Sequence, residues 1–334
     1  MWALRETTTH SAAEQVPVTA EAIEQAAVDL RTHLQATPLQ YSRAFTAKAG
    51  CHVYLKIEGI QPTRAFKVRG ALNKVMRLRP EERAAGVITA SAGNHGLGVA
   101  YAAQAFRIPA TVYVPEGANL LKVQAIKRMG SRVVHFGRAY DDAYHEALRT
   151  QESSGAIFVH AFDDPAVVAG QGTVGVELLE QLPSVDTVLV PVGGGGLIAG
   201  IAQYLKARRP AIRVVGVEPA GANALTRSLA QGELVTLDHV DTMADGLAAR
   251  TPGRIALSIA QACVDRMITV EETEMLRAIR LYFEWEHLLA EPAGAAALAA
   301  LLYHYAPEAN ERVVVLLSGA NIADEVMLSA LTTR

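Results

Sequence analysis

Short apolar runs alternate along this chain with segments in which apolar residues recur every three or four positions. The runs at 52–57, 110–114 and 313–317 are rich in valine, isoleucine and leucine, which is typical of strands buried on both faces. The segments at 97–106 and 197–207 have the helical spacing instead. The repeated strand–helix order predicts an α/β protein with open, twisted, mostly parallel sheets flanked by helices.

The same pattern gives approximate positions for the individual elements. We expect strands at 52–57, 87–90, 110–114, 133–136, 187–192, 214–217, 267–270 and 313–317, and helices at 71–78, 97–106, 120–129, 141–150 and 197–207. A further helix is expected after Thr19, whose hydroxyl can cap it, with Ile23, Ala27 and Leu30 on one face.

Composition narrows the class of protein. The 334 residues include 31 Lys and Arg against 34 Asp and Glu, and this balance does not favour a protein that binds nucleic acid. Cys51 and Cys263 lie far apart without a Cys-x-x-Cys motif, so neither a disulfide framework nor a structural zinc site is expected. No uncharged apolar run reaches the ~18 residues of a membrane span. The polar segment 1–15 lacks the order of a signal peptide, so we expect a cytoplasmic protein with a loosely held N-terminal arm.

Two segments carry a candidate amine and a candidate anion site. Lys67 lies in PTRAFKVRG (62–70), between a predicted strand and a predicted helix. In small, apolar surroundings the pKa of a lysine falls and its amine becomes a nucleophile, although a surface lysine is the structural alternative. The segment SAGNHG (91–96) also joins a strand to a helix, so its backbone N–H groups can hold a carboxylate or phosphate. An ordinary turn is the alternative there.

Two later segments occupy equivalent places in other strand–helix units. Four successive glycines, 193–196, cost backbone entropy and give up side-chain packing, and a phosphate held by their N–H groups explains them better than a plain turn. Ser318 follows the last predicted strand, at the sheet edge where open α/β sheets place ligands. Its structural alternative is to cap the final helix.

A nucleophilic lysine and a monophosphate loop together suggest pyridoxal phosphate. The four segments, in this order, resemble the serine/threonine dehydratase group of the tryptophan-synthase-β-like (fold type II) pyridoxal-phosphate enzymes, and the resemblance extends from Thr37 to Asn321. It implies two open, mostly parallel sheets flanked by helices. It also fits a small substrate-loop domain, residues 86–159, inserted into a large cofactor-binding domain made of residues 1–85 and 160–334.

The resemblance implies a role for each matching residue. Lys67 forms the Schiff base with the cofactor and later moves protons at the substrate Cα, and Ser318 meets the pyridine nitrogen, which makes these two the catalytic residues. The cofactor-binding set comprises Phe66, Lys67, Asn94, Gly193, Gly194, Gly195, Gly196, Leu197, Gly246, Glu291 and Ser318. The set that holds the substrate carboxylate comprises Ser91, Ala92, Gly93, Asn94 and His95.

These roles imply an ammonia-lyase that removes water from a β-hydroxy-α-amino acid and releases a 2-oxo acid and ammonia. A hydroxyl such as Ser318 cannot keep the pyridine nitrogen protonated as a carboxylate can, which favours reactions with a β leaving group. Serine racemases, which the chain also resembles, have a serine where Ala92 stands, and alanine cannot carry a proton. Arg64 stands where relatives usually have glycine, and its charge raises the prospect of a substrate with a second acidic group.

Several alternatives stay open at this stage. The chain could instead be a racemase or β-replacement synthase of the same fold, or a non-catalytic nucleotide-binding module. The substrate could be serine, threonine, 3-hydroxyaspartate, phenylserine or a hydroxyectoine-derived amino acid. Relatives imply a homodimer. We expect no metal site, because the glutamate that starts the cation site of some relatives matches Glu218 but the acid expected six positions later is Ala224.

Overall fold

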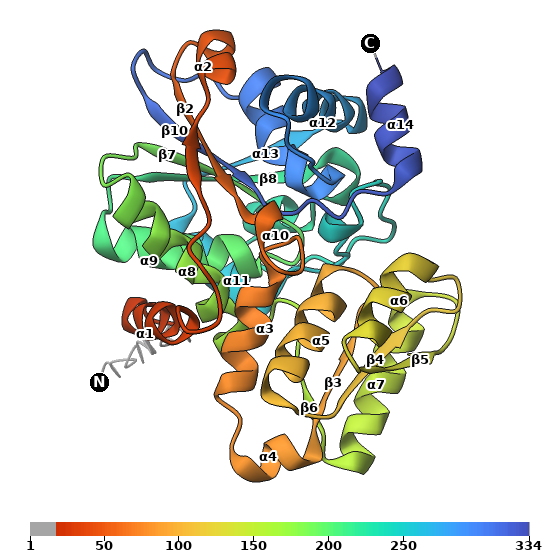
Figure 1. Ribbon diagram of the computed structural model, residues 1–334. Helices are drawn as coiled ribbons and strands as arrows, with labels where there is room; N and C mark the ends of the chain where they lie inside the picture. Colours follow the sequence, from red (N-terminus) through yellow and green to blue (C-terminus); the bar gives the residue numbers. More distant parts are fainter. Residues whose placement is uncertain (1–17, 334) are drawn as a thin grey trace, which may run out of the picture.

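The computed structural model describes residues 18–333, and these form two lobes, each built on its own sheet (Figure 1). The larger sheet has six strands in the order β1-β2-β10-β7-β8-β9, and the smaller has four in the order β5-β4-β3-β6. The strands are β1 (Leu39–Tyr41), β2 (His52–Ile57), β3 (Val87–Ala90), β4 (Ala110–Val114), β5 (Arg132–His135), β6 (Ile157–Phe158), β7 (Thr187–Pro191), β8 (Arg213–Pro219), β9 (Arg266–Val270) and β10 (Arg312–Leu317).

Parallel pairing dominates both sheets, which confirms the predicted α/β class. Each hydrogen-bonded pair of these strands is parallel except β1 with β2, which is antiparallel. The sequence did not predict β1, whose three residues are only partly buried or exposed. The predicted N-terminal arm lies outside the described residues.

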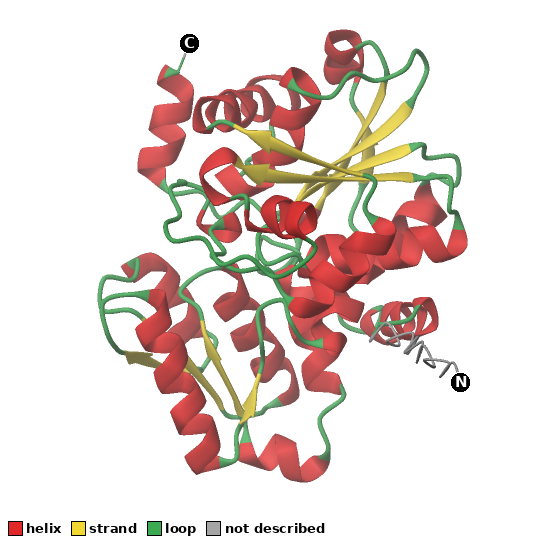
Figure 2. Ribbon diagram, turned by 180° about the vertical axis from the view of Figure 1, so that it is seen from behind, coloured by secondary structure: helices red, strands yellow, loops and turns green. Residues whose placement is uncertain are grey.

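Helices cover both faces of each sheet (Figure 2). They are α1 (Ala20–Leu30), α2 (Arg43–Ala49), α3 (Lys67–Met76), α4 (Pro80–Ala85), α5 (Asn94–Phe106), α6 (Leu120–Arg128), α7 (Tyr140–Ser154), α8 (Pro165–Gln181), α9 (Gly196–Arg208), α10 (Ala224–Gln231), α11 (Arg254–Cys263), α12 (Glu272–Glu286), α13 (Pro292–Tyr303) and α14 (Asp324–Thr332), with 3-10 turns η1 (Glu58–Ile60), η2 (Ala220–Ala222) and η3 (Asp245–Leu247). Among the described residues, no helix is both long and apolar enough to cross a bilayer.

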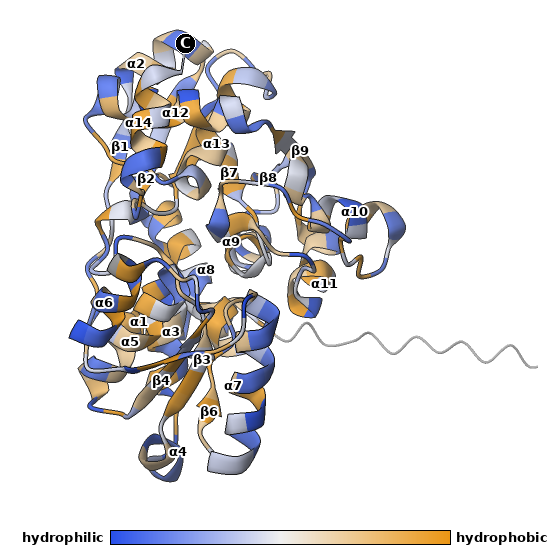
Figure 3. Cartoon of the chain, turned by 90° about the vertical axis from the view of Figure 1, so that its right-hand side faces the viewer, coloured by the Kyte–Doolittle hydropathy of each residue, from blue (hydrophilic) through white to orange (hydrophobic). Residues whose placement is uncertain are grey.

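Hydrophobic residues gather on the strands and on the helix faces turned toward them, whereas the outer surface of α7 is largely hydrophilic (Figure 3). One core cluster packs α12 and α13 against the larger sheet, and a second packs α1, α8, α9 and α11 against its other face. The capping prediction for α1 is confirmed, because the Thr19 hydroxyl accepts a hydrogen bond from the Ala22 N–H at 3.2 Å.

Two helices begin earlier than the apolar pattern predicted, and both differences matter for the site. α3 begins at Lys67 rather than at residue 71, and α5 begins at Asn94 rather than at residue 97. The polar first turns of these helices carry no apolar stripe, so periodicity alone missed them. As a result, the candidate lysine and asparagine both lie at helix N-termini.

The sequence also missed α8, which runs through the centre of the molecule (Figure 1). It is buried nearly all round and therefore lacks an amphipathic pattern. Its glycines allow close packing: a Cβ on Gly170 would lie 2.7 Å from the Arg69 carbonyl oxygen, and one on Gly172 would lie 2.9 Å from that of Gly200. α8 thus brings α3 and α9 together beneath the site.

Candidate functional site

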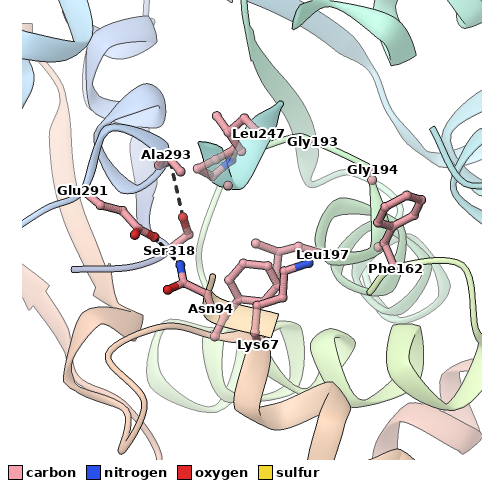
Figure 4. Close-up of a pocket in the computed structure, with 15 residues that line it drawn as sticks. Lys67, Asn94, Phe162, Gly193, Gly194, Leu197, Leu247, Glu291, Ala293 and Ser318 are labelled. Carbon is pink, nitrogen blue, oxygen red and sulfur yellow. Dashed lines mark hydrogen bonds between the residues drawn. The ribbon is translucent and has the colours of Figure 1, made fainter. Parts of the chain in front are cut away.

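The predicted site segments meet at one pocket between the two lobes (Figure 4). The pocket holds about 440 Å³ of space between protein atoms, part of it open to solvent. Its lining includes every residue of the predicted cofactor-binding set, namely Phe66, Lys67, Asn94, Gly193, Gly194, Gly195, Gly196, Leu197, Gly246, Glu291 and Ser318, together with Phe162, Pro191, Leu247 and Ala293. Arg64 is exposed with a φ of 60° and is not part of this lining.

Lys67 presents its amine inside this pocket rather than on the surface. Its Nζ donates a hydrogen bond to the Ala161 carbonyl oxygen at 2.9 Å and lies 5.2 Å from the centre of the Phe66 ring. Burial lowers the pKa of Lys67 to about 8, although the Glu291 carboxylate acts in the opposite direction. The unprotonated amine, which a nucleophile or base requires, is therefore a minor species at neutral pH but far more populated than it is for an exposed lysine.

A buried ion network anchors the helix that begins at Lys67. Arg69 Nε donates to Glu58 Oε2 at 2.7 Å, and Arg69 Nη1 donates to Glu177 Oε1 at 2.6 Å. Lys56 Nζ also reaches Glu177 Oε2 at 2.5 Å. The network joins η1, α3, α8 and β2, and its two positive charges balance its two negative charges. It fixes the first turn of α3 and hence the direction of the Lys67 side chain.

The glycine run forms a cradle that side chains would fill. A Cβ on Gly193 would lie 2.9 Å from the Gly246 carbonyl oxygen, and one on Gly194 would lie within 2.5 Å of three ring atoms of Phe162. Gly195 has a φ of 87°, in the left-handed region, and caps α9. The open N-terminus of α9 therefore faces the pocket, and backbone N–H groups at such a terminus bind phosphate.

On the opposite wall of the pocket, Asn94 links the two lobes of the molecule. Its Nδ2 donates to Glu291 Oε1 at 2.6 Å, and its Oδ1 accepts from Asn321 Nδ2 at 2.7 Å. Burial raises the pKa of Glu291 to about 7, although the hydrogen bond from Asn94 acts in the opposite direction. Ser318 Oγ donates to the Ala293 carbonyl oxygen at 3.3 Å. Ser318 does not cap the final helix, because α14 begins only at Asp324.

The predicted substrate loop forms the turn that leads into α5. The Gly93 N–H donates to Ser91 Oγ at 3.1 Å, and Gly93 is the N-cap of the helix. His95 Nε2 pairs with the Val159 carbonyl oxygen at 2.9 Å, and burial, followed by the charge of Lys67, lowers the pKa of His95 to about 3. A neutral His95 is therefore expected. Ser91, Ala92, Gly93 and His95 are not among the lining residues above and lie beside the pocket at the α5 N-terminus.

Sequence reasoning missed several residues of the site, and three of them make specific contacts there. Ala161 and Phe162 belong to the connection between β6 and α8, and Asn321 positions Asn94 although its segment had been singled out. The neighbouring Asp163 and Asp164 have structural roles, because Asp164 caps α8 and Asp163 Oδ1 accepts from the Ile255 N–H at 3.0 Å.

The Glu218 carboxylate accepts hydrogen bonds from the first turn of α10. It accepts from the N–H groups of Leu225 and Thr226 at 2.9 and 2.8 Å and from Thr226 Oγ1 at 2.6 Å. Burial raises the pKa of Glu218 to about 7 against these hydrogen bonds. Residues 18–333 contain no cluster of three or more histidine, cysteine or acidic side chains that could hold a metal ion.

The donor set of the pocket fits pyridoxal phosphate. The Lys67 amine can bind its aldehyde carbon, the glycine cradle at α9 can bind its phosphate, and the Ser318 hydroxyl can meet its pyridine nitrogen. The cradle is the decisive observation, because Cβ atoms on Gly193 and Gly194 would occupy it or collide with its walls.

Comparison with known proteins agrees with this assignment. A family model described as "Pyridoxal-phosphate dependent enzyme" matches residues 30–319. The chain is 46% identical over 300 residues to an L-threonine ammonia-lyase of Geobacter sulfurreducens, covering 90% of this chain and 75% of that protein. It is 42% identical over 305 residues to an L-threonine ammonia-lyase of Thermotoga maritima, covering 91% and 76%. The structure of maize serine racemase superimposes with a TM-score of 0.90 at 33% identity, covering 94% of this chain and 97% of that one. By the extent of the family match and by the identity to these relatives, the chain belongs to the pyridoxal-phosphate dependent enzymes.

Proposed function

We propose that this protein is an ammonia-lyase that acts on a β-hydroxy-α-amino acid of the threonine or serine type. The substrate loses water across Cα and Cβ, and hydrolysis of the product returns water and releases a 2-oxo acid and ammonia. One observation carries the proposal: the Lys67 amine, the glycine cradle and the Ser318 hydroxyl converge on a single pocket. The L-threonine ammonia-lyases of Geobacter and Thermotoga support the choice of reaction.

Bound pyridoxal phosphate would supply an electron sink conjugated to the substrate Cα, which acidifies the Cα proton. Lys67 would hold this cofactor through its Nζ, and the same Nζ, when free, would remove the Cα proton of the substrate. A pKa of about 8 for Lys67 supports this second role, because the free amine is populated near neutral pH. The Gly193–196 cradle with Leu197, and Phe66, Asn94, Gly246 and Glu291, would orient the ring.

The α5 N-terminus would bind the substrate carboxylate. Ser91, Ala92, Gly93, Asn94 and His95 bring backbone N–H groups and the positive end of a helix dipole to the side of the pocket. Because this turn and the four-stranded sheet both lie within residues 86–159, we assign those residues to a substrate-loop domain and residues 1–85 and 160–334 to a cofactor-binding domain.

Racemisation is the second candidate, favoured by the resemblance to maize serine racemase. A racemase must deliver a proton to the opposite face of Cα from a second group. Ala92 has no proton to deliver, and Ser318 has no negative charge that would keep a pyridine nitrogen protonated. Both residues favour elimination.

We also propose a cytoplasmic homodimer. Phe283, Trp285 and Leu289 are 42%, 40% and 52% exposed on α12 and the loop that follows, whereas Tyr282 is buried in the core. Large exposed apolar side chains along one helix and the loop after it are a candidate subunit interface. Sedimentation at micromolar concentration tests this, because a Trp285→Glu variant that sediments like the unaltered protein would contradict the assignment of this surface.

The test of the function is a product assay. The purified protein, loaded with pyridoxal phosphate, is incubated separately with L-threonine and L-serine, and 2-oxo acid, ammonia and the D-isomer are quantified. We expect equal amounts of 2-oxo acid and ammonia from at least one substrate, little D-isomer, and no product with Lys67→Ala. D-isomer in excess of 2-oxo acid would favour racemisation, and no product from either substrate would overturn the proposal.

A further inference from the structure

The connection between β6 and α8, residues 159–164, contains a turn that is held by a histidine ring. His160 Nδ1 accepts hydrogen bonds from the backbone N–H groups of Phe162 at 3.2 Å and Asp163 at 2.8 Å. A ring nitrogen can accept these bonds only while it carries no proton. The neutral tautomer with hydrogen on Nε2 is therefore the one that fits the turn.

Three successive residues of this turn contact the pocket or the segment beside it. The Ala161 carbonyl oxygen accepts from Lys67 Nζ at 2.9 Å. The Phe162 ring lies against Gly194 in the glycine run (Figure 4). Asp163 Oδ1 accepts from the Ile255 N–H at 3.0 Å, and the nearby Gly253 N–H donates to the Gly194 carbonyl oxygen at 2.9 Å. The turn thus contacts both the cofactor lysine and the wall of the phosphate cradle.

Side chains other than His160 fix both ends of this connection. The Val159 carbonyl oxygen accepts from Thr89 Oγ1 at 2.9 Å and pairs with His95 Nε2 at 2.9 Å. At the other end, Asp164 Oδ1 accepts from the N–H groups of Ala166 and Val167. In the middle of the connection, the backbone N–H groups of Phe162 and Asp163 have the His160 ring as their acceptor.

We propose that His160 is a positioning residue of the active site, whose unprotonated Nδ1 holds Ala161 against Lys67 and Phe162 against the glycine run. Protonation of the ring removes the acceptor and places an N–H opposite two backbone N–H groups, so the turn opens. The proposal rests on the proposed function for its effect on turnover, but the shape of the turn does not depend on that function.

The surroundings of His160 determine the direction in which its pKa is shifted. Burial lowers the pKa of His160, and the charge of Lys67 acts in the same direction, whereas Asp163 and Asp164 oppose it. The other titratable groups nearby are Tyr144, whose ring centre is 6.2 Å from that of His160, and His95. The turn is therefore held at neutral pH and opens as the pH falls below the ordinary histidine range.

Two substitutions distinguish the loss of the hydrogen-bond acceptor at position 160 from the loss of a ring that can be protonated. In His160→Asn the side-chain oxygen occupies nearly the position of Nδ1 and accepts hydrogen bonds at any pH, whereas His160→Leu removes the acceptor and keeps a similar bulk. His145→Leu is the matched control, because His145 is an exposed histidine on α7, the helix that precedes β6.

The first measurement is backbone hydrogen exchange of residues 160–164 in the apoprotein, corrected for the intrinsic dependence of exchange on pH. We expect these amides to be protected in the unaltered protein at pH 7.5. Their protection factors should fall about tenfold as the His160 ring is protonated at lower pH. His160→Asn should keep its protection across that range, and His160→Leu should lack it throughout. The second measurement is kcat/KM of the loaded enzyme at pH 7.5, which we expect to fall about 10²-fold in His160→Leu and less than about fivefold in His160→Asn and His145→Leu.

Protection in His160→Leu equal to that of the unaltered protein would overturn the proposal, and so would an Asn variant that exchanges as fast as the Leu variant. The exchange measurement needs neither cofactor nor turnover. Absence of lyase activity in the unaltered protein would therefore overturn the proposed function, while the exchange result alone would still decide the role of His160.

Discussion

Gly194→Ala is the single substitution that disturbs the phosphate cradle most directly. Gly194 does not have a positive φ, so alanine introduces no backbone strain there. Its Cβ would nevertheless lie within 2.5 Å of three ring atoms of Phe162. Carbon atoms in contact are ordinarily about 3.5–4.0 Å apart, so the ring or the glycine run must move by at least about 1 Å.

The half-buried Phe162 ring can turn away more easily than the backbone of the glycine run can shift. Overpacking of this size costs about 1–3 kcal/mol of unfolding free energy. Displacement of either wall also disturbs the N–H groups that bind phosphate, so we expect the affinity for pyridoxal phosphate to fall at least about tenfold, the equivalent of about 1.4 kcal/mol.

Urea unfolding of the apoprotein measures the first effect, and fluorescence titration with pyridoxal phosphate measures the second. Gly117→Ala is the control, because a Cβ there meets nothing within 4 Å. Adding Phe162→Ala removes the obstructing ring, and the double variant should recover most of the loss in affinity. If Gly194→Ala behaves like Gly117→Ala, or if removing the ring recovers nothing, the close approach of Phe162 does not shape the cradle.

Three further predictions concern charge. Arg69→Met leaves two buried glutamates without their main partner, so we expect urea unfolding to show a loss of about 3–5 kcal/mol; a loss below about 1 kcal/mol would contradict the anchoring role of the network. His95 has a pKa lowered to about 3, so its contribution to stability is complete above about pH 6.5 and declines as the pH falls, by about 2 kcal/mol at pH 5. Because the raised pKa of Glu291 acts in the opposite direction, the comparison is with His95→Gln, and an equal acid sensitivity of the two proteins would count against a neutral, buried His95. Finally, acetylation of Lys67 in the apoprotein, followed by peptide mass analysis against pH, should titrate near pH 8, whereas a midpoint near 10.5 would show that burial does not act on this amine.

Local chemistry in the sequence was sufficient to place the main site residues. Ser318 and the Gly193–196 run each follow a parallel strand, and the carboxyl ends of parallel strands meet at one edge of a sheet. The hydroxyl and the glycine cradle could therefore be expected in one place before any contact was known. The boundaries of α3 and α5 were less accurate, because their polar first turns carry no apolar stripe.

Contacts across long separations along the chain could not be predicted in this way. Lys67 and Ala161 are 94 residues apart, and they meet because the connection from β6 to α8 returns past the N-terminus of α3. The same return places Phe162 against Gly194, so the reason for glycine at that position lies in the tertiary structure. α8 itself was missed because a helix buried on all sides has no polar face to reveal its period.

The central claim is that the pocket around Lys67 is where pyridoxal phosphate is held for catalysis. Borohydride reduction of the loaded protein, followed by peptide mapping, tests this claim most directly. We expect one reduced pyridoxyl group per chain, on Lys67, and none in Lys67→Ala. A group fixed on a different lysine, or a protein that takes up no pyridoxal phosphate, would contradict it.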